Sequence, residues 1–202
     1  MIKAVIFDYG GVVTNETDLE LERIISNVLG FNLSAIMEKI KKPLSRFSRG
    51  DINEQEFWKE LSNKAKTKLP RNIFNDFWIL KYYKQVKIHK DVLNLVNKLK
   101  GKGYKVGLIS NTIKPHVRYN KKMGRYKYFD PVILSCEVGF EKPQRWIYKL
   151  ALKRLRLRPE ECVFVDDRKE NVRGASKVGI KAFLFKGAKQ FKKDLLSCGV
   201  KL

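Results

Sequence analysis

Five short apolar runs, separated by segments with helical spacing, constrain the fold of this chain more than any other feature. The runs are rich in Val, Ile and Phe, and most of them lack the alternation of polar and apolar residues that a half-exposed strand shows. Such runs are typical of strands buried on both faces of a parallel sheet. They are KAVIFD (3–8), KVGLIS (105–110), PVILS (131–135), CVFVD (162–166) and KAFLF (181–185).

Helical segments lie between the later runs, at residues 91–103, 143–155 and 169–179. Pro143 suits the first turn of its helix, and Gly179 suits the end of the last one. Because strands and helices alternate, we expect an α/β fold with a doubly wound, five-stranded parallel sheet of the Rossmann-like type.

Residues 15–85 break this alternation. Asn53 followed by Glu56 predicts a helix N-cap with its reciprocal glutamate. We expect a helical-bundle cap over residues 15–85 and an α/β core formed by residues 1–14 and 86–202. An insertion at this point lies above the carboxyl ends of the strands, where ligands bind in open α/β sheets. Helical spacing is found in LELERIISNVLGF (19–31), LSAIMEKIKKPLSRF (33–47), INEQEFWKELSNKA (52–65) and RNIFNDFWILKYYK (71–84).

The charge of the chain is strongly basic, with 43 Lys and Arg against 21 Asp and Glu and a formal net charge of +22. Residues 81–129 alone hold 14 basic residues and one acid, Asp91. Such a surface attracts anions, whether phosphorylated metabolites, nucleic acid or acidic partners. A lysine-rich solvated surface without a specific partner is the other reading of the same charge.

Other sequence features bear on the compartment. No apolar window reaches the about 18 residues of a membrane span, so we expect no membrane contact. The apolar part of the first run is too short for a signal peptide, and Asp8 interrupts it. Cys136, Cys162 and Cys198 are odd in number and contain no C-x-x-C pair, which predicts reduced thiols in a cytoplasmic protein.

Polar residues gather where the predicted strands end. Asp8 ends the first strand, Ser110 the second, and the pair Asp166-Asp167 the fourth, while Lys142 opens the helix after the third. Any one of them could simply cap a turn. Together they predict a single site at the carboxyl edge of the sheet.

Four stretches resemble, in order, the four motifs of the haloacid dehalogenase superfamily. They are FDYGGVV, LISNT, SCEVGFEKP and VFVDDRKENVRGASKVGIKAFLF. The resemblance covers the whole chain and includes a helical cap inserted after the first strand. Gly10 in the first motif and the run EKPQRWIYKLAL look most like the branch that includes sugar-1-phosphate phosphatases.

The resemblance implies roles for the residues of these motifs. Asp8 would be the nucleophile, forming a covalent ester that water then cleaves. Ser110 would donate its hydroxyl to the phosphoryl group with help from the Asn111 backbone, and Lys142 would neutralise charge around Asp8. The backbone N–H groups of Tyr9, Gly10 and Gly11 could bind a phosphoryl oxygen, since glycine permits close approach.

The resemblance also implies a Mg²⁺ site. Mg²⁺ favours carboxylate, carbonyl, water and phosphate oxygens. Asp8 and Asp167 would ligate the ion directly, Asp166 would act through water or through a bond to Lys142, and the carbonyl of Gly10 could supply another oxygen. Elsewhere in the fourth motif, Asn171 and Gly174 would shape the helix and carry no chemistry.

Four further residues are weaker candidates. His89 and His116 are the only histidines, and they stand in no triad or metal-ligand spacing. We expect both to be structural or exposed. Arg49 and Trp58 of the cap could touch substrate, although a tryptophan at helical spacing is more often part of a core.

Three functions remain open. The first is a Mg²⁺-dependent phosphatase that hydrolyses a small phosphorylated metabolite, for example a sugar phosphate, through a phospho-aspartate. The second is a metal-independent 2-haloacid dehalogenase, which usually lacks the VDD pair and tends to carry tyrosine where Gly10 stands. The third is a non-enzymatic basic protein that binds nucleic acid, although all the candidate catalytic residues are present. No motif identifies the substrate or the oligomeric state.

Overall fold

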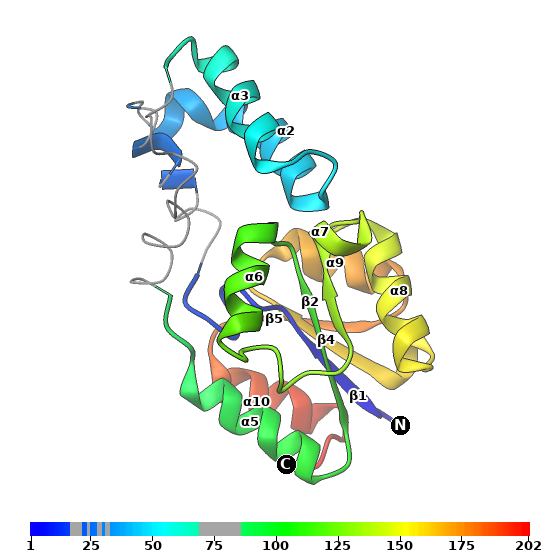
Figure 1. The fold of residues 1–202 in the computed structure, drawn as a ribbon. Coiled ribbons are helices and arrows are strands. Elements are labelled where there is room, and N and C mark those ends of the chain that lie inside the picture. The colour runs from blue at the N-terminus through cyan, green and yellow to red at the C-terminus, as the bar shows by residue number, and fades with distance from the viewer. Residues whose placement is uncertain (17–21, 24, 28–29, 31–32, 69–85) are drawn as a thin grey trace.

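The computed structural model (Figure 1) describes residues 1–202 except 17–21, 24, 28–29, 31–32 and 69–85. Its centre is a five-stranded sheet in the order β3-β2-β1-β4-β5, and every neighbouring pair is parallel. The predicted α/β class and the five-stranded parallel sheet are therefore confirmed. The strands are β1 (Ala4–Phe7), β2 (Lys105–Ser110), β3 (Val132–Leu134), β4 (Cys162–Asp166) and β5 (Lys181–Leu184).

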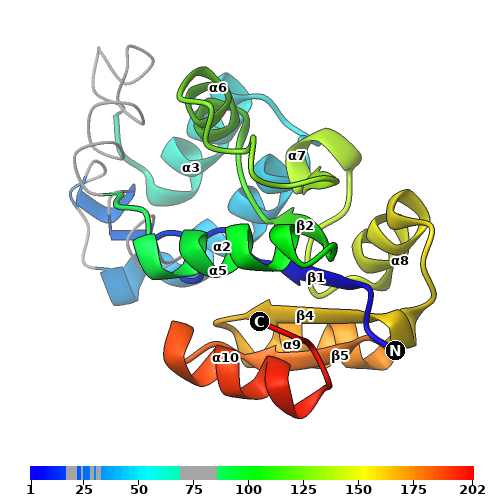
Figure 2. The same ribbon diagram turned by 90° about the horizontal axis from the view of Figure 1, so that it is seen from below.

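Helices cover both faces of the sheet. α5 (Lys90–Gly101) and α10 (Ala188–Ser197) lie side by side on one face, as Figures 1 and 2 both show. α8 (Arg145–Leu155) and α9 (Lys169–Lys177) cover the other face. The remaining elements of the core are α6 (Lys114–Lys122), α7 (Ser135–Val138) and the short 3₁₀ helix η1 (Pro159–Glu161).

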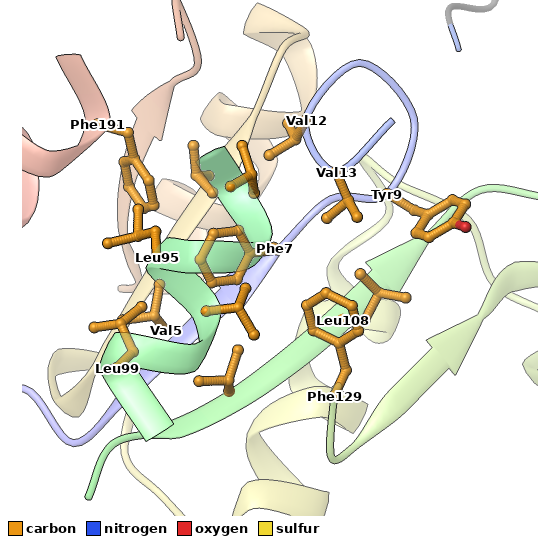
Figure 3. Close-up of a cluster of buried hydrophobic side chains, with 14 of the residues drawn as sticks. Val5, Phe7, Tyr9, Val12, Val13, Leu95, Leu99, Leu108, Phe129 and Phe191 are labelled. Carbon is orange, nitrogen blue, oxygen red and sulfur yellow. The ribbon is translucent and has the colours of Figure 1, made fainter. Parts of the chain in front are cut away.

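Alternate residues of β1 feed the two halves of the core, because successive side chains of a strand point to opposite faces. Val5 and Phe7 pack into the cluster between the sheet and helices α5 and α10, whereas Ala4 and Ile6 pack on the opposite face against α8 and α9. Figure 3 shows the first cluster, in which the Phe7 ring meets the Phe191 ring edge-on at a centroid distance of 5.6 Å. Burial on both faces explains why the strand runs show no polar alternation.

The helix predicted over 143–155 begins later than expected. Its first residue is Arg145 and its N-cap is Gln144, so Pro143 precedes the helix instead of occupying its first turn. The physical reason is a turn before the helix, in which the Gln144 N–H donates to the Glu141 carbonyl at 2.8 Å.

The inserted segment contributes two well-described helices, α2 (Leu33–Arg49) and α3 (Glu54–Ala65), which lie at the top of Figure 1 above α6 and α7. The predicted capping box at the start of α3 is confirmed, since the Asn53 side chain accepts from the Glu56 N–H and the Glu56 side chain accepts from the Asn53 N–H. The helix predicted over 71–84 lies outside the described residues, and the one over 19–31 lies largely outside them.

The cap helices α2 and α3 share an apolar cluster that includes Phe47, Phe57 and Trp58, with the first two rings stacked at 4.7 Å. Ile113, the N-cap residue of α6, belongs to the same cluster. Among the described helices, none combines the length and the apolar character needed to cross a membrane.

Candidate active site

The candidate catalytic side chains converge because neighbouring strands end together. Asp8 follows β1, Ser110 is the last residue of β2, and Asp166 is the last residue of β4. β1 lies between β2 and β4 in a parallel register, so the three residues share one edge of the sheet. All three are buried, with exposed fractions of 5% or less.

Lys142 joins two of these strands through a buried ion-pair triad. Its Nζ lies 2.5 Å from Asp8 Oδ1 and 2.7 Å from Asp166 Oδ2. Burial lowers the pKa of the Lys142 ammonium, but the Asp166 and Asp8 carboxylates outweigh burial and raise that pKa above its ordinary value. The lysine is therefore a fixed positive charge beside the candidate nucleophile.

Asn111 holds the backbone of this lysine from the end of β2. Its side-chain oxygen accepts from the Lys142 N–H at 2.8 Å, and its side-chain NH₂ donates to the Lys142 carbonyl at 3.0 Å. The neighbouring Ser110 lines the cavity, and its hydroxyl donates to the Asn111 carbonyl at a long distance of 3.4 Å. Asn111 thus holds the Lys142 backbone through its side chain, which the sequence did not predict.

Asp166 is held in place from several directions. Besides Lys142, it accepts from the Arg168 N–H at 2.9 Å and from the Asn171 side chain at 3.0 and 3.1 Å. Asn171 therefore orients a candidate site residue in addition to lying in α9. At Gly174 the packing favours glycine, because a Cβ there would lie 2.8 Å from the Pro143 carbonyl oxygen.

The loop after β1 brings three residues close to the site. The Tyr9 N–H donates to Asp8 Oδ1 at 2.6 Å, whereas the Tyr9 ring points into the core (Figure 3). Gly11 has a φ of +71°, and a Cβ on it would lie 2.2 Å from Asp167 Oδ2. Only glycine fits this position, both for its backbone conformation and for the approach of the Asp167 carboxylate. Gly10 lines the cavity beside Asp8.

Three carboxylates form a cluster that could hold a cation. Oxygens of Asp8, Asp166 and Asp167 lie within 4.8 Å of one another. Burial, and next the Asp166 charge, raises the pKa of Asp8 well above its usual range, against the opposing effect of Lys142. The same two causes raise the pKa of Asp167 to about 6. Three carboxyl groups thus lie beside a single ammonium group, that of Lys142. A hard divalent cation prefers oxygen ligands, so these side chains are suited to bind one.

Two adjoining cavities meet at these residues. The inner one, of about 40 Å³, is lined by Asp8, Gly10, Glu16, Ser110, Asn111, Lys142, Asp167, Arg168 and Asn171. The outer one, of about 300 Å³, shares Glu16, Asn111, Lys142 and Arg168 with it and extends to Leu44, Ser45 and Ser48 of α2. The site therefore has a small polar end at Asp8 and a larger end beneath the cap.

Sequence reasoning missed Glu16 and Arg168, which line both cavities. Arg168 directly follows Asp166 and Asp167 in the sequence, and this proximity could have identified it as a candidate. Glu16 stands in a loop that contains no motif, so the sequence offered no such indication. His116 is buried on α6, with its Nδ1 3.5 Å from Glu16 Oε1, and it lines the outer cavity. His89 has a structural contact, from its Nδ1 to the Val12 carbonyl oxygen at 2.9 Å.

The two cap candidates take other places. Trp58 is fully buried in the cap core. Arg49 pairs with Asp51 at 2.6 Å and with Glu141 at 3.2 Å. Neither Trp58 nor Arg49 is among the described residues that line the two cavities.

The sequence profile of the haloacid dehalogenase-like hydrolases matches residues 2–179. The chain belongs to this family. A magnesium complex of a haloacid dehalogenase family enzyme from Bacteroides thetaiotaomicron has a similar fold, with a TM-score of 0.74 and 23% identity, covering 95% of this chain and 98% of that one. The shared fold thus includes nearly the whole hydrolase.

Two curated relatives of this haloacid dehalogenase-like hydrolase are named as phosphatases. The glyceraldehyde 3-phosphate phosphatase of Methanothermobacter thermautotrophicus is 43% identical over 89 residues, which are 43% of this chain and 39% of that relative. The D-ribitol-5-phosphate phosphatase of Bacteroides thetaiotaomicron is 24% identical over 208 residues, 96% of this chain and 97% of that relative. The more identical match therefore spans less than half of its relative.

Proposed function

We propose that this hydrolase is a Mg²⁺-dependent phosphatase that cleaves a small phosphorylated metabolite, such as a sugar phosphate, through a phospho-aspartate. The observation that carries the proposal is the buried triad in which Lys142 bridges Asp8 and Asp166, with Asp167 beside it. The names of the two phosphatase relatives support the same reaction class.

In this proposal Asp8 attacks phosphorus, the phosphorus–oxygen bond to the leaving group breaks, and water then hydrolyses the aspartyl phosphate. Lys142 neutralises charge on Asp8 and on the phosphoryl oxygens, and the Ser110 hydroxyl donates to one of those oxygens. The backbone N–H groups of Gly10 and Gly11 are further candidate donors, whereas that of Tyr9 donates to Asp8 itself. The inner cavity takes the phosphoryl group and the outer one takes the rest of the metabolite.

Mg²⁺ would be held by Asp8 and Asp167, with the Gly10 carbonyl as a further oxygen, while Asp166 acts through Lys142 or a bound water. When bound, Mg²⁺ offsets the negative charge of the carboxylates and of the phosphoryl oxygens. The proposal includes the division into a core of residues 1–14 and 86–202 and a cap of residues 15–85. It also includes a cytoplasmic location, to which the three free cysteines are suited.

The two other functions account for less of the site. A metal-independent 2-haloacid dehalogenase would use Asp8 and could use Asp166 to hold Lys142, but it would leave Asp167 and the cluster of three carboxylates without a role. A protein that only binds nucleic acid would use the basic residues of 81–129 and would leave the buried triad unexplained. The triad is costly to bury, because charges lose hydration in a protein interior.

A substrate screen tests the proposal. Purified protein is incubated with a panel of phosphorylated metabolites and 2-haloacids, in Mg²⁺ and in EDTA, and released phosphate and halide are measured. We expect phosphate release that EDTA abolishes and Mg²⁺ restores, and we expect Asp167→Ala to remove most of it. Glu160→Ala, at an exposed position of η1, is the matched control and should match wild type. Halide release that persists in EDTA would instead establish the dehalogenase.

A further inference from the structure

The Glu141 carboxylate ties the cap to the loop that carries the candidate catalytic lysine. Its Oε1 accepts from the Ser45 hydroxyl at 2.5 Å and from Arg49 Nη1 at 3.2 Å, and both donors belong to α2 of the cap. The side chains of Glu141 and Arg49 are only 17% and 23% exposed. The contact is therefore a partly desolvated, charge-assisted bond between segments far apart in the sequence.

Hydrogen bonds within residues 141–144 fix the geometry of this loop, so a shift of Glu141 is passed on to Lys142. The Glu141 N–H donates to the Gln144 side chain at 3.1 Å, and the Gln144 N–H donates back to the Glu141 carbonyl at 2.8 Å. Lys142, the next residue, is held by the two bonds from Asn111 and reaches Asp8 and Asp166. A displacement of Glu141 would consequently move the backbone from which the Lys142 side chain extends.

A second contact places the same end of α2 on the core. The Ser135 hydroxyl donates to the Ser48 carbonyl at 2.6 Å and accepts from the Thr112 N–H at 2.8 Å. Gly50, with a φ of +76°, lies so close to α7 that a Cβ there would be 2.6 Å from the Cys136 carbonyl oxygen. The end of α2 is therefore seated on α7, and Ser135 links it further to Thr112, in the segment that follows β2 and carries Asn111.

Glu141 also lines the outer cavity, so its charge faces the space proposed for the substrate. An uncompensated carboxylate there would repel a phosphate ester. Arg49 Nη1 lies 3.2 Å from Glu141 Oε1 and supplies part of the compensating charge, while its Nε and Nη2 donate to Asp51.

We propose that Glu141 is the positioning residue through which the seated cap fixes the Lys142 loop, and that Arg49 neutralises Glu141 so that an anionic substrate can enter. The catalytic part of this inference rests on the phosphatase function proposed above. The structural coupling between α2 and the Lys142 loop does not depend on that function.

A double-substitution cycle tests the charge role, using p-nitrophenyl phosphate as the substrate. Arg49→Ala should lower kcat/KM by roughly tenfold, mostly through a higher KM, because the Glu141 carboxylate loses its charged partner. Glu141→Gln should cost less, and adding it to Arg49→Ala should restore part of the loss. Arg46→Ala is the matched control, since Arg46 lies on the same helix and pairs with Glu60 inside the cap. Losses that simply add in the double variant would overturn the charge role.

Amide hydrogen exchange tests the mechanical role without relying on turnover. Arg49→Ala should speed exchange both at the end of α2 and in residues 139–144, whereas Arg46→Ala should affect the cap alone. Unchanged exchange in residues 139–144 of the Arg49→Ala variant would overturn the positioning role. If wild-type protein releases no phosphate from any ester while exchange changes as expected, the proposed function fails and the positioning of the loop stands.

Discussion

At the residue scale, the buried Asp8 carboxylate is both the proposed nucleophile and a source of instability. Its pKa is raised by burial and by Asp166, so the folded protein binds a proton at Asp8 more tightly than the unfolded chain does. The contribution of Asp8 to the free energy of unfolding is therefore greatest at low pH. It is lost as the pH rises from the pKa of Asp8 in the unfolded chain toward its higher pKa in the folded protein. The ionised form of Asp8 is thus disfavoured in the folded protein relative to the unfolded chain.

Asp8→Asn follows directly from this balance. The amide keeps the volume and can still accept from Tyr9 and Lys142, but it is not a nucleophile. Turnover should fall below about 1% of wild type, in line with the loss of a covalent pathway, and in metal-free buffer at neutral pH the unfolding temperature should not fall. Steady-state assays and thermal unfolding measure the two effects. Turnover near the wild-type rate would rule out the phospho-aspartate.

Gly10 lines the cavity beside Asp8 and has no side chain that could protonate the leaving oxygen or later deprotonate water. General acid–base help is worth about 10² to 10⁴ in rate. We expect wild type to prefer phosphates with easily departing groups, such as sugar 1-phosphates, acyl phosphates and aryl phosphates. Hydrolysis of the phospho-aspartate should be slow as well, so a burst of p-nitrophenol should precede steady turnover.

Gly10→Asp tests this expectation with Gly10→Ala as its control, because a Cβ at this position already lies 3.2 Å from the Glu16 carbonyl oxygen. Relative to Gly10→Ala, the aspartate should raise the rate on alkyl phosphates more than on aryl phosphates. Equal wild-type rates on alkyl and aryl esters would show that another group supplies the proton. Glu16 lines the same cavity and would then be the first residue to mutate.

At the scale of elements, the N-cap of α3 offers a measurable contribution to stability. Both bonds of the Asn53–Glu56 capping box are present. Asn53→Ala should lower the free energy of unfolding by about 1 kcal/mol, the usual cost of losing such a cap. Urea denaturation followed by circular dichroism measures it, with exposed Lys59→Ala in the middle of the same helix as the control. A loss equal to that of the control would show that the cap residue adds nothing.

The sequence predicted elements well where a local pattern decided them. Apolar runs located each strand to within one residue at either end. Strand ends located Asp8, Ser110 and Asp166 at one edge because parallel neighbours end together. The start of α8 was wrong because the turn at residues 141–144 depends on a backbone bond that no residue pattern encodes. The roles of Arg49 and Asn111 depend on contacts between distant segments, and periodicity carries no information about those.

At the scale of the whole molecule, the net charge of +22 should act at long range and without sequence specificity. We expect only weak binding to nucleic acid, lost as salt rises toward the physiological range, because such affinity comes from counterion release. Fluorescence anisotropy with a labelled DNA duplex at several salt concentrations measures it, and a labelled uncharged polymer is the control. Tight binding at physiological salt would favour the nucleic-acid function.

The position of β1 in the middle of the sheet has a consequence for biosynthesis. Ala4 on this strand pairs with Lys105 on one side and Cys162 on the other, and both partners are distant in sequence. A ribosome must therefore have released the chain beyond residue 162 before the strand that precedes Asp8 can gain its second neighbour. Contacts this distant in sequence slow folding. The nascent polypeptide consequently carries an apolar strand with at least one open edge until residue 162 has emerged, and the Asp8 carboxylate gains its buried surroundings only with that second pairing.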